Sequence, residues 1–165
     1  MQQPLDLINL KREHVKRLAN QKGAAGEAEV LAATVQYMAR PKGRALDNLM
    51  AALKESGVVI KGSRFDAVAL LIDRVVDFTD AAAVKANLPD MVFVEIKTAN
   101  QERVRPDFSG FFFALTEGEL VASEALGSRH RVMLLNNATG TMPLTSVPEI
   151  LARARSTKWQ VSVQR

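Results

Sequence analysis

The chain lacks cysteine, and it has only two histidines among its 165 residues. The absence of cysteine excludes disulfide bonds, thiolate metal sites and cysteine nucleophiles, and two histidines are too few for most zinc sites. Apolar runs are also short, because a stretch such as residues 67–72 is far below the roughly 20 apolar residues that cross a membrane. The N-terminus is polar and has no signal-peptide core. We therefore expect a soluble, cytoplasmic protein with no membrane partner.

Composition and charge predict a single domain with an unevenly charged surface. The chain is 47% hydrophobic, which suffices for one core, and its formal net charge is +4. Residues 10–22 carry five basic residues against one acidic residue, whereas residues 66–95 carry six acidic residues against two basic ones. We expect a basic helix or arm over residues 1–22 and one domain over residues 23–165. A basic rim around an acidic centre suits a metal-dependent enzyme acting on a polyanion, although an ordinary solvated surface has the same composition.

Local patterns predict an α/β fold. Amphipathic periodicity and helix-breaking residues indicate helices over residues 5–19, 27–39, 44–56, 81–87, 116–126 and 147–154. Short β-branched and aromatic runs indicate strands over residues 58–60, 65–72, 91–98, 111–115, 131–136 and 158–163. Thr116 and Glu119 have the spacing of a capping box, and we interpret them as structural. This order of elements predicts a mixed central sheet with helices on both sides.

The strand predicted over residues 91–98 carries two opposite charges in an otherwise apolar run. Glu95 and Lys97 are two residues apart, so their side chains share a face, roughly 7 Å apart along the strand. An edge or half-exposed strand with a cross-strand salt bridge is the alternative explanation. If the strand that Asp66 opens pairs with this one, two carboxylates converge and would bind Mg²⁺, with the Ile96 carbonyl as a third ligand. Lys97 would then orient the attacking water.

A third carboxylate, Glu27, is selected by helix geometry. At 100° per residue it lies in the apolar face of the helix predicted over residues 27–39, whereas Glu29 lies on the other side. A carboxylate on a buried face needs a partner, so we expect Glu27 to reach the site and to be a possible further metal ligand. Its position near the start of the helix also allows a simple capping role.

Glu27, Asp66 and the stretch Glu95-Ile96-Lys97 together resemble the PD-(D/E)xK nuclease superfamily. Residues 94–98, 111–116 and 131–135, with Glu119 and Ala122, are similar to the branch related to the C-terminal domain of the plant protein NO VEIN. The resemblance covers roughly residues 24–155. It implies a restriction-endonuclease-like core, a mixed central β-sheet flanked by helices, and Mg²⁺-dependent cleavage of DNA or occasionally RNA, with Mn²⁺ as a substitute for Mg²⁺.

The chain departs from the family pattern at two points. Asp66 and Glu95 are 29 residues apart, which is longer than a tight hairpin requires. The literal Pro89-Asp90 pair lies only five residues before Glu95, and this odd spacing puts Asp90 on the opposite face of the strand. We interpret Asp90 as a turn residue, and Asp73 and Asp77 are the fallback ligands if the strands pair differently.

Basic residues outside the acidic centre are candidates for contacts with the nucleic-acid backbone. The candidates are Lys11, Arg12, Lys16, Arg17, Arg40, Lys42 and Arg44, with Arg153, Arg155 and Lys158 similarly placed near the C-terminus. Contacts of this kind add affinity without sequence specificity, and the same residues would also serve as a solvated surface. Both histidines, His14 and His130, are isolated, and we expect them to be exposed or hydrogen-bonded and not catalytic.

The leading hypothesis is a metal-dependent nuclease with DNA as its partner, in which Asp66 and Glu95 bind Mg²⁺, Lys97 assists the water and Glu27 supports them. Cleavage of a duplex needs two cuts and this chain is small, so we expect a homodimer. The main alternative is a non-catalytic nucleic-acid-binding or assembly module with the same fold. A small-molecule enzyme that uses the Glu95 and Lys97 pair for acid–base chemistry explains the basic rim less well.

Overall fold

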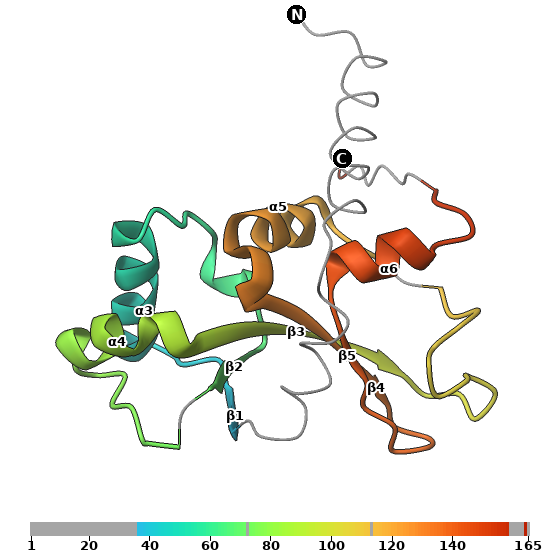
Figure 1. The fold of residues 1–165 in the computed structure, drawn as a ribbon, viewed down its shortest axis with the longest axis horizontal. Helices are drawn as coiled ribbons and strands as arrows, with labels where there is room; N and C mark the ends of the chain where they lie inside the picture. Colours follow the sequence, from blue (N-terminus) through green and yellow to red (C-terminus); the bar gives the residue numbers. More distant parts are fainter. Residues whose placement is uncertain (1–35, 72, 113, 159–163, 165) are drawn as a thin grey trace, which may run out of the picture.

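The polypeptide forms an α/β fold in the computed structural model, which describes residues 36–71, 73–112, 114–158 and 164 (Figure 1). The described strands are β1 (Gln36–Ala39), β2 (Ala67–Leu70), β3 (Met91–Ala99), β4 (His130–Asn136) and β5 (Leu144–Thr145). The described α-helices are α3 (Arg44–Glu55), α4 (Ala81–Asn87), α5 (Glu117–Leu126) and α6 (Val147–Arg153). Three short 3-10 helices, η1 (Gly62–Arg64), η2 (Leu88–Asp90) and η3 (Gly127–Arg129), connect these elements.

The five strands form one mixed sheet in the order β1-β2-β3-β4-β5. Neighbouring strands are antiparallel except β3 and β4, which are parallel and are connected through α5. The nine-residue strand β3 lies at the centre of the sheet and pairs along both edges. The charged pair therefore lies on the central strand, in its half-buried part beyond Val94, where β3 pairs with β4 but not with β2.

Two apolar clusters lie side by side on one face of the sheet. The first packs α3 and α4 against β2 and β3, and it includes Leu53, Val84 and Phe93. The second packs α5 and α6 against β4, through Leu120 and Val147. The opposite face carries a smaller apolar cluster of alternate residues from β2 and β3, namely Ala67, Ala69, Val92 and Val94. All four described helices thus cover one face, and the predicted helical layer on the second face is not seen in the described ranges.

Four predicted helices are confirmed, and three of them, α4, α5 and α6, begin at a side-chain cap. Asp80 accepts a hydrogen bond from the backbone N–H of Ala82 at 3.0 Å and caps α4. Thr116 and Glu119 form the predicted capping box at α5. Ser146 caps α6 in the same way. Such caps satisfy backbone donors that have no partner inside the helix, so they mark helix starts independently of tertiary context.

Several predicted elements differ from the structure. Residues 36–39, predicted as the end of a helix over 27–39, form strand β1 and pair with β2. Residues 58–60 are not a strand, although Val58 is buried against the first cluster. The described residues of 111–115 also form no strand, and Phe111 packs edge-to-face on Phe108, with ring centroids 5.5 Å apart. The strand predicted over residues 65–72 is shorter in the structure, where it is β2. Strand β5 was not predicted, because two residues are too few to show the alternation of a strand.

Several other expectations lie outside the described residues. These are the helix over residues 5–19, the proposed domain boundary after residue 22, and the final strand beyond Lys158. Within the ranges that the structure covers, no helix is both long enough and apolar enough to cross a membrane.

The edge-to-face contact between Phe93 and Phe65, with ring centroids 5.1 Å apart, predicts a large stability loss when Phe93 is truncated. Phe93 is fully buried in the first cluster. We expect Phe93→Ala to lower the free energy of unfolding by about 3–5 kcal/mol, measured by urea denaturation. Val75→Ala, at a residue that is 95% exposed, should change it by less than about 0.5 kcal/mol. Equal effects of the two substitutions would contradict this core.

Candidate active site

Glu95 and Lys97 lie on β3 at the junction between the two apolar clusters. Phe93 on the same face belongs to the first cluster, and Ala99 belongs to the second. Because alternate strand residues share a face, the two charged side chains project toward the helices. Their side chains are only 14% and 19% exposed, respectively. The two charges are therefore partly desolvated, and each needs a polar partner.

Asp66 lies directly before β2 and has an irregular backbone. Its N–H donates to the carbonyl of Val94 on β3 at 2.8 Å, whereas its own carbonyl accepts from the N–H of Arg40 after β1 at 2.8 Å. A regular residue of an antiparallel strand directs both groups to the same neighbour. Asp66 thus interrupts the ladder in the manner of a β-bulge, a feature that re-aims side chains next to functional sites.

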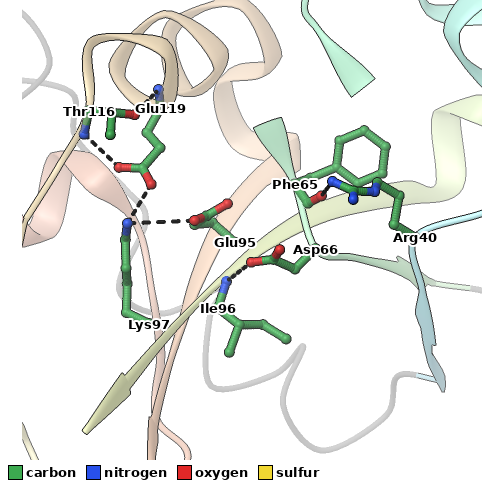
Figure 2. Close-up of polar contacts among 8 residues, drawn as sticks. All are labelled: Arg40, Phe65, Asp66, Glu95, Ile96, Lys97, Thr116 and Glu119. Carbon is green, nitrogen blue, oxygen red and sulfur yellow. Dashed lines mark hydrogen bonds and ion pairs between the residues drawn. The ribbon is translucent and has the colours of Figure 1, made fainter. Parts of the chain in front are cut away.

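The side chain of Asp66 reaches across to β3, as Figure 2 shows. Its Oδ2 atom accepts a hydrogen bond from the backbone N–H of Ile96 at 2.9 Å. The predicted pairing of these two strands is confirmed, with Ala67 opposite Val94. Since β2 does not extend opposite Ile96, the backbone of Ile96 on this edge of β3 is left to the Asp66 carboxylate. Asp66 and Glu95 are close enough for the charge of Asp66 to raise the pKa of Glu95.

Glu119, in the first turn of α5, completes the group. One of its carboxylate oxygens accepts from the backbone N–H of Thr116 at 2.7 Å, and the other pairs with the Nζ of Lys97. The same Nζ lies 3.5 Å from an oxygen of Glu95, so Lys97 bridges two carboxylates (Figure 2). Our interpretation of Glu119 as a structural cap is incomplete, because the capping residue also holds the lysine.

A signal for Glu119 was present in the chain. The helix after β3 leads directly into a parallel strand, so its first turn must start beyond the carboxyl end of β3 and return over the sheet. An acidic residue in that turn then lies above the last polar side chains of the strand. The spacing of Thr116 and Glu119 located the helix start, but it did not show which strand lies beneath it.

The carboxylates differ in their affinity for protons. Desolvation, followed by the hydrogen bond with Glu119 and the charge of Asp66, raises the pKa of Glu95 to about 7, although Lys97 opposes this. Desolvation also acts to raise the pKa of Glu119, but the hydrogen bonds from Lys97 and Thr116 outweigh it and the net shift is downward. Glu119 is therefore the better partner of Lys97, and Glu95 is the carboxylate whose charge lacks full compensation.

The donor set fits a hard divalent cation. Asp66 and Glu95 supply carboxylate oxygens. The two negative charges repel each other, and a cation between them would relieve this repulsion. Among the described residues, no group of three or more His, Asp or Glu side chains is gathered as a metal cage. Mg²⁺ commonly takes only one or two protein carboxylates and completes its shell with water and substrate phosphate. The pair therefore suits Mg²⁺ better than an ion that needs a full protein cage.

The other predicted acidic ligands do not join this group. Asp90 lies in η2 and pairs with Arg74 at 3.7 Å, which confirms its interpretation as a turn residue. Asp77 accepts from Thr79 in a local turn, and these bonds lower the pKa of Asp77. Asp73 lies in the exposed loop that follows β2, at the opposite end of the strand from Asp66. The strands pair as expected, so the fallback ligands Asp73 and Asp77 are not needed, and Glu27 lies outside the described residues.

The candidate nucleic-acid contacts have different surroundings. Lys42 and Arg44 are exposed at the start of α3. Arg40 donates from Nη1 to the carbonyls of Phe65 at 3.1 Å and Gly62 at 3.3 Å, so it fixes the segment that leads into Asp66 (Figure 2). The C-terminal candidates Arg153, Arg155 and Lys158 are exposed, and Lys11, Arg12, Lys16 and Arg17 lie outside the described residues.

His130 begins β4 beside Phe93 and is 1% exposed. Neither ring nitrogen has a hydrogen-bond partner in the part of the chain that the structure describes. The expectation of an exposed or hydrogen-bonded histidine is therefore wrong for His130. Burial lowers the pKa of His130 to about 4, against the opposing charge of Glu119. The ring is neutral at physiological pH and acts as part of the core.

Comparison with known proteins gives no match for this chain. No protein-family model, no curated protein and no solved structure is similar to it. The functional interpretation is therefore drawn from the residues and their geometry. A carboxylate on β3 and one directly before β2, with a lysine on the same face of β3 as Glu95, can bind a cation and place an ammonium group beside it.

The buried His130 predicts an acid-sensitive stability. Its pKa of about 4 in the folded chain is below the unfolded value of about 6.5, so the unfolded state binds more protons between these pH values. The stability it contributes is complete above about pH 6.5 and is lost as the pH falls toward 4. Between about pH 7.5 and pH 5 the wild type should lose about 2 kcal/mol more than His130→Phe in urea unfolding. Parallel pH dependences would contradict the buried, neutral ring.

Proposed function

We propose that this chain is a metal-dependent nuclease that hydrolyses phosphodiester bonds in DNA, with RNA as the alternative substrate. The observation that carries the proposal is the convergence of Asp66, Glu95 and Lys97 from two neighbouring strands onto one partly buried spot. Clusters of ionisable groups with shifted pKa values are common at functional sites. The sequence resemblance to PD-(D/E)xK nucleases points to the same residues.

The carboxylates of Asp66 and Glu95, with the carbonyl of Ile96, would hold Mg²⁺ or Mn²⁺. When bound, the ion supplies a Lewis acid for the phosphate and lowers the pKa of bound water. The hydrogen bond from the N–H of Ile96 to Asp66 fixes the carboxylate that reaches across from β2. Glu95 stands on β3 itself, so the same central strand positions both donors, Glu95 directly and Asp66 through its hydrogen bond.

Lys97 is the proposed catalytic residue for the attacking water. Its Nζ would donate a hydrogen bond to that water and would stabilise the negative charge that develops on the phosphate oxygens. Glu119 is a positioning residue, because its carboxylate holds Nζ and is itself fixed by the backbone N–H of Thr116. The capping box thus connects the start of α5 to the orientation of the lysine.

The fold supports a restriction-endonuclease-like core at the level of its sheet. A mixed five-stranded sheet with β3 at its centre carries the proposed residues, and helices cover the face that they occupy. Lys42 and Arg44 are exposed cations near the segment that leads to Asp66 and would contact the nucleic-acid backbone. Cleavage of both strands of a duplex would be served by a homodimer.

Replacement of Lys97 is the direct test of catalysis. We expect Lys97→Ala to reduce metal-dependent cleavage by about 1,000-fold, because one proton-transfer or charge-stabilising group is removed. The assay uses labelled supercoiled, linear and single-stranded DNA, and RNA, with EDTA, Mg²⁺ or Mn²⁺. Lys97→Met retains most of the apolar stem of the lysine, and circular dichroism reports whether each variant is folded.

Lys85→Ala is the matched control for this experiment, because Lys85 pairs with Glu55 on the surface and its side chain is 67% exposed. It should cut like the wild type. If folded Lys97→Ala and Lys97→Met both cut as fast as Lys85→Ala, the proposed active site is wrong.

Metal binding is a separate prediction. Isothermal titration of Mn²⁺ should detect a site that Asp66→Asn weakens by about 100-fold or more, because one of two charged ligands is lost. Asp73→Asn, at the opposite end of β2, should bind Mn²⁺ like the wild type. If the wild type takes up no cation yet binds nucleic acid, the chain is a non-catalytic nucleic-acid-binding or assembly module with this fold.

A further inference from the structure

Arg64 places a guanidinium group next to the proposed active site. It ends η1, two residues before Asp66, and its side chain extends to the first turn of α5. There it lies against Gly118, the residue before Glu119. Arg64 therefore stands between the segment that carries one site carboxylate and the helical turn that carries another.

The guanidinium group of Arg64 occupies the space that a side chain at Gly118 would take. A Cβ atom built on Gly118 would overlap the Cζ, Nε and Nη1 atoms of Arg64. Glycine in the first turn of an exposed helix lowers helix stability relative to alanine. The absent side chain at Gly118 is thus what leaves space for the guanidinium group.

The base of Arg64 is firmly held. Its N–H donates to the carbonyl of Lys61 at 3.1 Å, and Arg40 donates to the carbonyls on either side of Arg64, at Gly62 and Phe65. Gly62 also packs on Leu46 of α3. These contacts fix the backbone from which the Arg64 side chain extends.

The guanidinium group itself has no comparable partner. Within the described ranges, the Arg64 side chain forms no hydrogen bond and no ion pair. It is nevertheless half-buried and lies close to a site with three carboxylates and a single ammonium group. A divalent cation would balance that excess of negative charge, but a phosphodiester would then add one more negative charge.

We propose that Arg64 binds the phosphate group of the nucleic acid at the active site. Its planar set of N–H donors matches two phosphate oxygens at once, which an ammonium group does not do. The ligand is a phosphodiester next to the bond that is cut, and Gly118 is the residue that admits the guanidinium group. This inference rests on the proposed nuclease function and adds a substrate-binding residue to it.

Two substitutions test the inference from different sides. Arg64→Ala removes the guanidinium group, and Gly118→Ala keeps it but displaces it with a single methyl group. We expect each to reduce cleavage by about 100-fold, the effect of losing one positioned donor. In the Arg64→Ala background, Gly118→Ala should have little further effect, since both substitutions act through the same group. Arg74→Ala, beyond the other end of β2, should cut like the wild type.

A binding measurement separates this inference from the proposed function. In the Lys97→Ala background with Mg²⁺, the affinity for a fluorescent DNA duplex is measured by anisotropy at several salt concentrations. Arg64→Ala should weaken binding severalfold and reduce the slope of log affinity against log salt by about one, the signature of one lost phosphate contact. A role in packing alone would leave this slope unchanged.

The outcomes are distinct. If the wild type cuts in a Lys97-dependent manner but both Arg64→Ala and Gly118→Ala match Arg74→Ala, the role of Arg64 is refuted and the nuclease stands. If the wild type never cuts, the nuclease proposal fails, and the salt slope still decides whether Arg64 contacts phosphate. Gly118→Ala should fold at least as well as the wild type, because alanine favours the helix. Its melting curve excludes misfolding as the cause of a loss.

Discussion

The ammonium group of Lys97 lies between the carboxylates of Glu95 and Glu119, and the helical face of the sheet is arranged around this bridge. Ionised groups lose hydration when they are buried, so a cluster of this kind persists only where partners replace the lost water. Here the capping box fixes Glu119, and the cluster fills the gap between two apolar clusters. The position of α5 over the sheet and the orientation of the lysine therefore depend on the same contacts.

A second constraint operates at the start of β2. Asp66 directs its two backbone groups to opposite neighbours, and its side chain replaces the strand partner that Ile96 would otherwise have. The regular ladder stops there, which leaves part of the β3 edge free for other ligands. Polar groups of a central strand are normally consumed by the sheet. The irregular start of β2 therefore leaves backbone polar groups of the central strand β3 unpaired with β2.

Local signals predicted a substantial part of this architecture. The helices at residues 44–56, 81–87, 116–126 and 147–154, and the strands at 91–98 and 131–136, agree with the structure within a few residues. Those elements have caps or long, clear periodicity. The errors fall on short apolar runs, such as residues 58–60. A run of apolar residues is expected both for a buried loop and for a strand of the sheet, so the sequence does not distinguish them. Residues 36–39 became a strand because β2 was available as a partner, which no local signal reports.

The sequence by itself determined that Glu95 and Lys97 share a face and that Thr116 and Glu119 start a helix, because both facts follow from the repeat of a single element. Only the tertiary structure decided that Glu119 meets Lys97, that Asp66 meets Ile96 and that Arg64 meets Gly118. These pairs are 22, 30 and 54 residues apart in the chain. Contacts over such distances depend on strand register and on the path of the crossover helix, which arise from packing the whole core and not from any local pattern.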